Sequence, residues 1–507
     1  MSSNVGRRRF LKELALSSIG LPLLSRIAHA DRRGDLRLAG TPKNIVVLGA
    51  GLAGLSAAFE LQNAGHNVTL IEARKTVGGR VRTIRGVFND GQYAEAGALS
   101  FPQSHTFTYG YATDFNLPLR PVFKVGLGQI GDLGGSVFRI NPDGSSNIPL
   151  SLKASERQAG IYGLISLYLG QYIANVGNPR KAGWPSPDIA QLDGVSCGDL
   201  LTSLGASDNA ITVMQALGIG LLGFGISSVS ALDTVFTESI TTDQPFFEVI
   251  GGNDLLPAAF RQRFKGTFKK KSTVQSINQD LSSVTVTYLH AGTIQNITAD
   301  FAVCALPFSI LKDIAVTPAF SAAKQQAINN LAMTPVTRTY LQFSSRLWEQ
   351  NGYDGDGVTD LEIQNTYSPS LTQSGTSGIL TSYAAGQNAL DLAQLSESAR
   401  EHFVLGKLNN LFPGVKGLFE TGTSMIWQDD PYAKGAFVYF QPGQMTTLLP
   451  AAQQPEGLIH FAGEHTSAWH GWMNGALESG NRAAAEIVQT ASQQSIWLRA
   501  TSKAGLT

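Results

Sequence analysis

Residues 43–83 read KNIVVLGAGLAGLSAAFELQNAGHNVTLIEARKTVGGRVRT, and the later motifs of the chain make sense as segments that fold back onto this stretch. Residues 44–48 form a short apolar run rich in β-branched side chains, which predicts a strand, and residues 67–71 predict a second strand. Between them, an apolar, alanine-rich stretch that stops at Gly65 predicts a helix. The order strand, tight turn, helix, strand is typical of a parallel α/β sheet.

The tight turn after the first strand carries glycines at the spacing of a dinucleotide-binding site. Gly49 permits the turn, Gly51 lets backbone N–H groups approach a pyrophosphate, and Gly54 lets helix and strand pack closely. Glu72 follows about 20 residues later, where a carboxylate can accept the hydroxyl groups of an adenosine ribose. A glycine-rich turn alone is a weak signal, but the strand, the helix and the acid together favour dinucleotide binding.

The sequence after Glu72 helps to distinguish NAD from FAD, because it continues as E-A-R-x-x-x-G-G-R-x-x-T. This continuation resembles the flavin amine oxidase superfamily, whose members hold FAD. The resemblance implies that Gly79 helps the chain to turn back over the phosphates and that Arg80 and Arg82 neutralise them.

The end of the chain carries the most specific motif. Residues 459–484 contain F-A-G-E-H-T and H-G-W-M-N-G-A-L-E-S-G-N-R-A-A, a block that resembles bacterial L-amino acid oxidases. The resemblance implies that Gly463 and Glu464 reach the ribityl-phosphate region, and that a helix begins near Gly471 with its positive end aimed at the flavin. Trp472 falls where amine oxidases place one wall of an aromatic cage, and an ordinary core tryptophan is the alternative.

Shorter motifs between these two ends extend the cofactor assignment. In residues 93–104, Gly97 and Ala98 leave no side chain to block a flat ring, and the superfamily passes this segment beside the isoalloxazine. The G-G-N-D-L-L-P segment at residues 251–257 resembles one after which a valine backbone contacts the adenine, and Val274 is the candidate here. The residues assigned to FAD are Gly49, Gly51, Leu52, Ala53, Gly54, Glu72, Ala73, Arg74, Gly79, Arg80, Gly97, Ala98, Leu99, Val274, Gly463, Glu464, Gly471, Trp472 and Met473.

Residues 337–343 alternate like a strand and, with R-L-W-E at 346–349, resemble the T-K-x-x-L-x-F…R-F-W segment of amine oxidases. In that family the lysine holds a water against flavin N5, and here its position carries Arg338. Arginine keeps the charge but is longer, planar and essentially never deprotonated, so the exchange is not conservative. We therefore assign Arg338, with Trp472, to catalysis; the alternative is an arginine on the solvent face of a strand.

The resemblance also bears on the flavin linkage and the substrate. Some relatives bond the flavin to a cysteine where this chain carries Gly435, so FAD is expected to be non-covalent. L-amino acid oxidases grip the substrate carboxylate with an arginine in a G-x-x-R-x-P stretch, and Ser100 occupies that position here. Serine cannot neutralise a buried carboxylate, which favours an amine, or an amino acid bound in an unusual way. The residues assigned to the substrate are Ser100, Tyr367, Trp427, Ala436 and Trp472.

Length and composition limit the remaining possibilities. A chain of 507 residues exceeds one typical core, which predicts two domains. Lys+Arg 38 balance Asp+Glu 38, so nothing indicates a nucleic-acid partner. Cys197 and Cys304 have no metal-ligand spacing, and no metal is expected.

The first residues predict export. Residues 4–12 read N-V-G-R-R-R-F-L-K, an apolar stretch covers residues 14–24, and Ala28-His29-Ala30 matches a signal peptidase site. This pattern resembles a twin-arginine signal over residues 1–30, which implies the twin-arginine export machinery as a partner and a periplasmic or secreted location. The alternative is a membrane anchor, but the apolar run is too short to span ~30 Å of hydrocarbon, so stable membrane insertion is not expected.

The predicted fold class is α/β, with a Rossmann-type FAD-binding domain and an interleaved α+β substrate domain, as in the amine oxidase fold. The FAD-binding domain is expected to take residues 42–105, 241–318 and 445–490, and the substrate domain residues 106–240, largely helical, and 319–444. Helices are expected at residues 155–176, 197–204 and 208–217, the last two entered after Ser196 and Ser207.

The reaction that the resemblance implies is hydride transfer from the carbon of a neutral amine to flavin N5. Water would hydrolyse the resulting imine, and O₂ would reoxidise the flavin and yield H₂O₂. The alternatives are a flavin desaturase or oxidase of an isoprenoid- or porphyrin-like substrate, and a non-catalytic binding protein with FAD as structural filler. If amines bleach the flavin under anaerobic conditions, the chain is an amine oxidase and neither of these alternatives. The sequence is also compatible with a homodimer.

Overall fold

The computed structural model describes residues 41–122, 126–241 and 245–503, with side chains as far as residue 493. One of its sheets, here called the parallel sheet, has the order β10-β2-β1-β14-β23. Strands β1 (Asn44–Leu48) and β2 (Asn67–Ile71) and helix α3 (Leu52–Asn63) confirm the first predictions. The other strands come from distant parts of the chain: β10 (Thr267–Lys269), β14 (Phe301–Cys304) and β23 (Ile459–Phe461). The glycine-rich turn therefore follows the middle strand.

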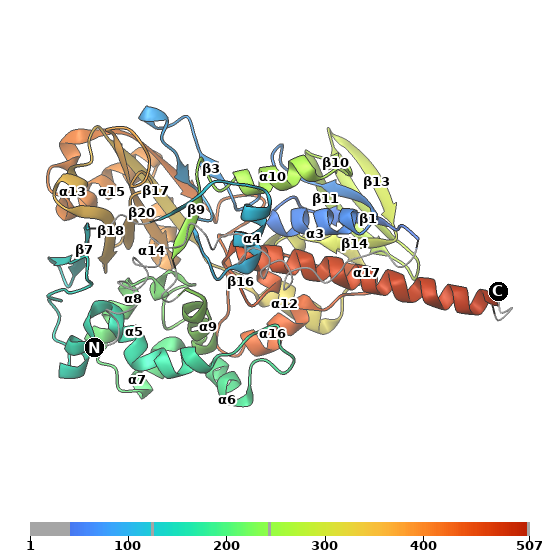
Figure 1. The fold of residues 1–507 in the computed structure, drawn as a ribbon, viewed down its shortest axis with the longest axis horizontal. Coiled ribbons are helices and arrows are strands. Elements are labelled where there is room, and N and C mark those ends of the chain that lie inside the picture. The colour runs from blue at the N-terminus through green and yellow to red at the C-terminus, as the bar shows by residue number, and fades with distance from the viewer. Residues whose placement is uncertain (1–40, 123–125, 242–244, 504–507) are drawn as a thin grey trace, which may run out of the picture.

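Two helices packed along each other support that turn. Helix α17 (Met473–Lys503) packs against α3 (Figure 1), and both bury apolar side chains in the core that holds strand β1. A Cβ at Gly54 would lie 1.9 Å from the Gly49 carbonyl oxygen, and one at Gly480 would lie 2.3 Å from the Ala53 carbonyl oxygen. Only glycine permits these close approaches, which agrees with the packing role expected of Gly54.

A second sheet, the mixed sheet, lies on the far side of the molecule from α17 (Figure 1) and has the order β21-β17-β20-β19-β18-β7-β8. All residues of β17 (Val336–Phe343) are buried, because the strand has neighbours on both edges and side chains packed on both faces. The arginine that this strand carries therefore does not face solvent. The other strands are β7 (Gly128–Leu133), β8 (Ser136–Ile140), β18 (Tyr353–Thr359), β19 (Asn365–Tyr367), β20 (Gly378–Ala385) and β21 (Phe419–Ile426).

A group of helices lies below the mixed sheet in Figure 1. Two of them begin as expected, because the Ser196 and Ser207 hydroxyls accept N–H groups of Asp199 and Ala210. The helices are α5 (Ala154–Asn175), α6 (Pro187–Ala190), α7 (Cys197–Ser203), α8 (Asp208–Ala216) and α9 (Ala231–Thr241).

The remaining elements connect these parts. A further sheet, β13-β12-β11-β15, contains an antiparallel hairpin formed by β12 and β13. Its strands are β11 (Ser272–Gln279), β12 (Val284–His290), β13 (Thr293–Ala299) and β15 (Ala315–Thr317). Other helices are α4 (Thr106–Asp114), α10 (Leu255–Arg263), α12 (Ala322–Asn330), α14 (Gly386–Gln394), α15 (Glu397–Leu411) and α16 (Met445–Gln453).

The expected export signal at residues 1–30 lies outside the described residues. In the part of the chain that is described, no helix combines the length and the apolar character needed to cross a bilayer.

Candidate active site

A cavity of about 480 Å³ is lined by residues of both sheets and of the helical group. Its volume lies within the range of small-molecule sites, about 300–1,000 Å³. Every residue assigned to FAD lines it except Gly54, which packs beneath the turn. Ser100, Arg338, Trp427 and Ala436 also line it, so motifs scattered along the sequence meet at one place.

The part of the cavity next to β1 fits a dinucleotide. A Cβ built on Gly51 would have no atom within 4 Å, which leaves open space above the helix N-terminus. Glu72 lies beside this space, and its carboxylate accepts N–H groups of Ala50 and Arg74, each at 2.7 Å. Burial raises the pKa of Glu72, while these hydrogen bonds oppose the rise. Glu72 is thus a buried acceptor at the edge of the cavity beside the glycine-rich turn.

An ion pair joins the first motif to the last. Arg80 Nη1 lies 2.5 Å from Glu464 Oε1 and also donates to the Ala436 carbonyl oxygen at 3.0 Å. Glu464 accepts the N–H of Gly471 at 2.8 Å. Although burial raises the pKa of Glu464, the charge of Arg80 brings it below the usual value. Arg82 differs from the expectation, because it points to Asp430 (3.2 Å) and does not line the cavity.

The segment at Gly97 leaves no room for a side chain. A Cβ there would lie 1.7 Å from the Arg80 carbonyl oxygen and 3.3 Å from the ring of Trp427. Trp427 is buried and its indole N–H donates to the Ala96 carbonyl oxygen at 2.8 Å. Gly97 therefore packs closely against Arg80 and Trp427, and Gly97 and Ala98 line the cavity with no side chain larger than a methyl group.

Arg338 lies beside this segment and not on a solvent face, so the alternative interpretation of its position is wrong. Its side chain is 5% exposed, and Nη1 donates to the Gly97 carbonyl oxygen at 2.5 Å and to that of Glu95 at 3.3 Å. Tyr383, opposite Arg338 on β20, stacks its ring 4.1 Å from the guanidinium carbon. A fixed cation is thus buried at the wall of the cavity.

Aromatic side chains form much of the opposite wall. Trp472 packs edge-on against His105 (5.0 Å between ring centres), and its ring lies tilted at 41° to that of Phe246 (6.2 Å). His105 is buried, and burial lowers its pKa to about 3, so it packs as a neutral ring. Phe437 also lines the cavity.

The residues expected to touch the substrate are not all at the cavity. Ser100, Trp427, Ala436 and Trp472 line it. Tyr367 does not: it lies in the mixed sheet near Tyr340 and Arg338, where burial raises its pKa well above the usual value. Tyr367 was expected near the substrate from the family resemblance alone, but it belongs to β19 and does not line the cavity.

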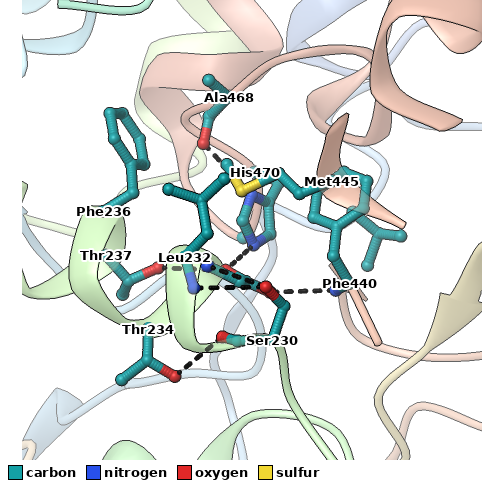
Figure 2. A network of polar contacts seen from close by, with 12 residues as sticks. Ser230, Leu232, Thr234, Phe236, Thr237, Phe440, Met445, Ala468 and His470 are labelled. Carbon is teal, nitrogen blue, oxygen red and sulfur yellow. Dashed lines mark hydrogen bonds and ion pairs between the residues drawn. The ribbon is translucent and has the colours of Figure 1, made fainter. Parts of the chain in front are cut away.

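A buried ion pair ties the helical group to the cavity wall. His470 Nε2 lies 2.8 Å from Asp233 Oδ1, and both side chains are almost fully buried. Figure 2 shows His470 beside the first turn of α9, with its other ring nitrogen facing the Ala468 carbonyl oxygen at 3.1 Å. Burial lowers the pKa of His470, but the Asp233 carboxylate raises it above the usual value overall. The pair fixes α9 next to Trp472.

Sequence reasoning missed the residues that α9 and β20 bring to the cavity, namely Thr237, Glu238, Thr241 and Tyr383. Among them, Glu238 is the one carboxylate that the described helical group contributes. Burial raises its pKa to about 7. The sequence ALDTVFTESIT of α9 gives no clear signal for these residues, because Glu238 stands there among Thr237, Ser239 and other polar residues.

Comparison with known proteins gives a consistent result. The model of the family of flavin-containing amine oxidoreductases matches residues 52–488. YobN of Bacillus subtilis (strain 168), whose name assigns it provisionally to the L-amino-acid oxidases, is 36% identical over 90% of this chain and 96% of its own. The L-amino-acid oxidase of Vipera ammodytes ammodytes is 30% identical over 91% of this chain and 96% of its own.

Solved structures show the same fold. A putrescine oxidase bound to putrescine superposes with a TM-score of 0.77 at 21% identity, covering 89% of this chain and 99% of that one. Cyclohexylamine oxidase from Brevibacterium oxydans superposes with a TM-score of 0.75 at 21% identity. The superposition covers 90% of this chain and 99% of that one. The FAD-binding geometry, the family match and the relatives agree: the chain is a flavin-dependent oxidoreductase that uses FAD, and it belongs to the family of flavin-containing amine oxidoreductases.

Proposed function

We propose that the chain is an oxidase of a primary amine, which it converts to an imine that water hydrolyses to an aldehyde and ammonia. FAD supplies the hydride acceptor when bound, and O₂ then takes the electrons as H₂O₂. The chain's own task is to bind the neutral amine, to orient its carbon and to exclude water. The aromatic wall formed by Trp472 and Phe437 is suited to that task.

Ser100 is the observation that favours an amine over an amino acid. Ser100 lines the cavity, and the resemblance of its G-x-x-R-x-P stretch implies that L-amino acid oxidases carry there the arginine that holds the substrate carboxylate. Enclosing a carboxylate without a cationic partner costs several kcal/mol. A substrate without a carboxylate avoids this cost.

A second candidate is an L-amino acid held in an unusual way. The names of the relatives favour it. Arg338 also offers a cation at the cavity, although its Nη1 already donates to the carbonyl oxygens of Glu95 and Gly97. A carboxylate would have to bind the remaining guanidinium N–H groups.

Matched substrates distinguish the two candidates. We expect kcat/KM for phenethylamine to equal or exceed that for phenylalanine, and kcat/KM for cadaverine to equal or exceed that for lysine, because Ser100 gives the carboxylate no charge partner. The measurement is the initial rate of H₂O₂ release. A preference for the amino acid of more than about a hundredfold, ~2.7 kcal/mol, would show that a carboxylate anchor exists.

FAD is expected to leave the protein completely on acid precipitation. Gly435 stands where some relatives carry the flavin-linked cysteine, and a Cβ there would lie 2.4 Å from Met333 Cβ. The free thiols of Cys197 and Cys304 are buried and do not line the cavity. The check is the absorbance of supernatant and pellet, and yellow flavin retained in the washed pellet would contradict the prediction.

We also propose that the enzyme is exported. The twin-arginine pattern in residues 4–12 supports export of a folded, FAD-loaded protein to the periplasm or beyond.

A further inference from the structure

The backbone carbonyl oxygens of residues 95–99 all accept hydrogen bonds from buried side chains. The first three accept from Arg338 Nη1, which reaches them from β17. The last two, those of Ala98 and Leu99, accept from Asn253 Nδ2 at 3.0 and 2.7 Å. Side chains from two separate parts of the chain therefore fix the direction in which the peptide groups of this segment point.

Asn253 lies in the turn between β9 (Phe246–Val249) and α10 and is fully buried. Its Oδ1 accepts the N–H of Val249 at 2.9 Å, and its own backbone N–H donates to Glu95 Oε1 at 2.8 Å. If the amide oxygen and nitrogen exchanged places, the nitrogen would face an N–H donor and the oxygen would face two oxygens. The contacts therefore determine the orientation of the amide, and both of its N–H bonds are used on the segment.

The carbonyl groups that Asn253 holds determine where the next N–H groups point. In a trans peptide group, the C=O bond and the N–H bond of the following residue point in opposite directions. The N–H groups of Leu99 and Ser100 therefore point away from Asn253. Neither has a hydrogen-bond partner in the part of the chain that the structure describes, whereas the N–H groups of residues 96–98 donate to backbone carbonyl oxygens. Leu99 and Ser100 line the cavity, so their N–H groups are available to a molecule bound there.

The bound cofactor gives these two N–H groups a partner. The pyrophosphate and the adenosine ribose belong at the glycine-rich turn and Glu72, so the flavin ring belongs in the part of the cavity lined by residues 97–100 and Arg338. Reduced flavin carries negative charge on its ring, and N–H donors that are held in place stabilise such charge without reorganising.

We propose that Asn253 is a positioning residue for the cofactor: it binds the carbonyl oxygens of Ala98 and Leu99, directs the N–H groups of Leu99 and Ser100 to the flavin ring, and thereby raises the reduction potential of the flavin. Asn253 does not line the cavity, so it acts through the segment that does. The inference depends on FAD and not on the compound that is oxidised, so it goes beyond the proposed function.

Asn253→Leu tests the inference, because leucine resembles asparagine in shape but has neither donors nor an acceptor. The midpoint reduction potential of the bound flavin is measured in equilibrium with a redox dye, without any amine. We expect the variant to bind reduced FAD, relative to oxidised FAD, at least about tenfold more weakly than the parent does, which lowers the potential by ~30 mV. A purely structural role of Asn253 would weaken the binding of both forms alike and leave the potential unchanged.

Asn481→Leu is the matched control. Asn481 is a buried asparagine on α17 that does not line the cavity; its Nδ2 donates to the Leu477 carbonyl oxygen at 2.8 Å, and its Oδ1 accepts the Tyr111 hydroxyl at 2.9 Å. The same substitution there should change the affinity ratio of reduced to oxidised FAD by less than about twofold, ~9 mV. The inference is overturned if Asn253→Leu binds FAD and stays within that limit, or if both variants shift equally.

Hydrogen exchange of the parent holoenzyme provides a test that needs no variant. Mass spectrometry with fragmentation resolves the N–H groups of Leu99 and Ser100. Since neither has a protein partner, donation to the flavin ring predicts exchange at least about a hundredfold slower than in an unstructured peptide. Asn253→Ala, which replaces Asn253→Leu if the latter releases FAD, should exchange these two groups about tenfold faster than the parent. Exchange in the parent at the rate of an unstructured peptide overturns the inference.

Discussion

Asp233→Ala is expected to lower the free energy of unfolding by about 3–5 kcal/mol, the range found when one partner of a buried ion pair is removed. The Asp233 carboxylate lies 2.8 Å from His470 Nε2 and accepts the N–H of Phe440 at 2.9 Å. Alanine would leave both donors buried without an acceptor. Urea unfolding of parent and variant at equal FAD concentration gives the difference, since bound cofactor adds to apparent stability.

The free energy of unfolding that Asp233→Ala loses should depend on pH. The pKa of His470 is raised in the folded protein, because the Asp233 carboxylate outweighs the effect of burial. A histidine whose pKa is raised on folding adds to the free energy of unfolding. This contribution is complete below the pKa of the unfolded histidine, about 6.5, and disappears as the pH rises through the pKa in the folded protein. The gap between parent and Asp233→Ala should therefore be wider at about pH 6 than at about pH 9.

Two further variants separate the contribution of the charge from that of side-chain size and test whether Asp233 acts through His470. Asp233→Asn keeps the size and one oxygen acceptor, so it should cost less than alanine and isolate the charge. His470→Ala combined with Asp233→Ala should cost less than the sum of the single changes, as expected for residues in contact. An Asp233→Ala protein within about 1 kcal/mol of the parent at pH 6, or additive losses, would show that the pair contributes little.

The parts of the site that the sequence predicted are those where the backbone itself is constrained. A side chain at Gly97 would overlap the Arg80 carbonyl oxygen, and one at Gly51 would enter the open space at the start of α3 that a dinucleotide is expected to fill. Glu72 lies at a fixed distance along a strand, helix and strand whose lengths are regular. Such constraints are local, and a single sequence displays them.

The parts that the sequence did not predict depend on contacts between distant segments. Asp233 meets His470 only because α9 packs against the loop before α17, and no local pattern announces that contact. Tyr383 faces Arg338 because β17 and β20 pair in that register within the mixed sheet. Glu238 has the sequence surroundings of an ordinary surface acid, and only its place at the cavity distinguishes it.

Arg338→Met is expected to slow flavin reduction by the amine, or reoxidation by O₂, on the order of a hundredfold, as when one preorganised donor is removed from an active site. Methionine matches the length of the buried stem but removes the charge and the hydrogen bonds to the carbonyl oxygens of Glu95 and Gly97. Both half-reactions are followed by stopped-flow absorbance per bound FAD. The normalisation separates a kinetic effect from lost cofactor.

Arg338→Lys is the matched control, because it restores the residue that the family carries and keeps a positive charge beside Gly97. It should recover most of the rate if charge at this wall of the cavity is what matters. The lysine side chain is shorter and reaches fewer carbonyl oxygens. Lysine therefore cannot fully replace the hydrogen bonds that Arg338 Nη1 donates to Glu95 and Gly97. If Arg338→Lys is also slow, the hydrogen bonds of the guanidinium group, and not its charge alone, are needed for the rate. If the methionine variant stays within about twofold in both half-reactions, ~0.4 kcal/mol, Arg338 only supports the strand on which it lies.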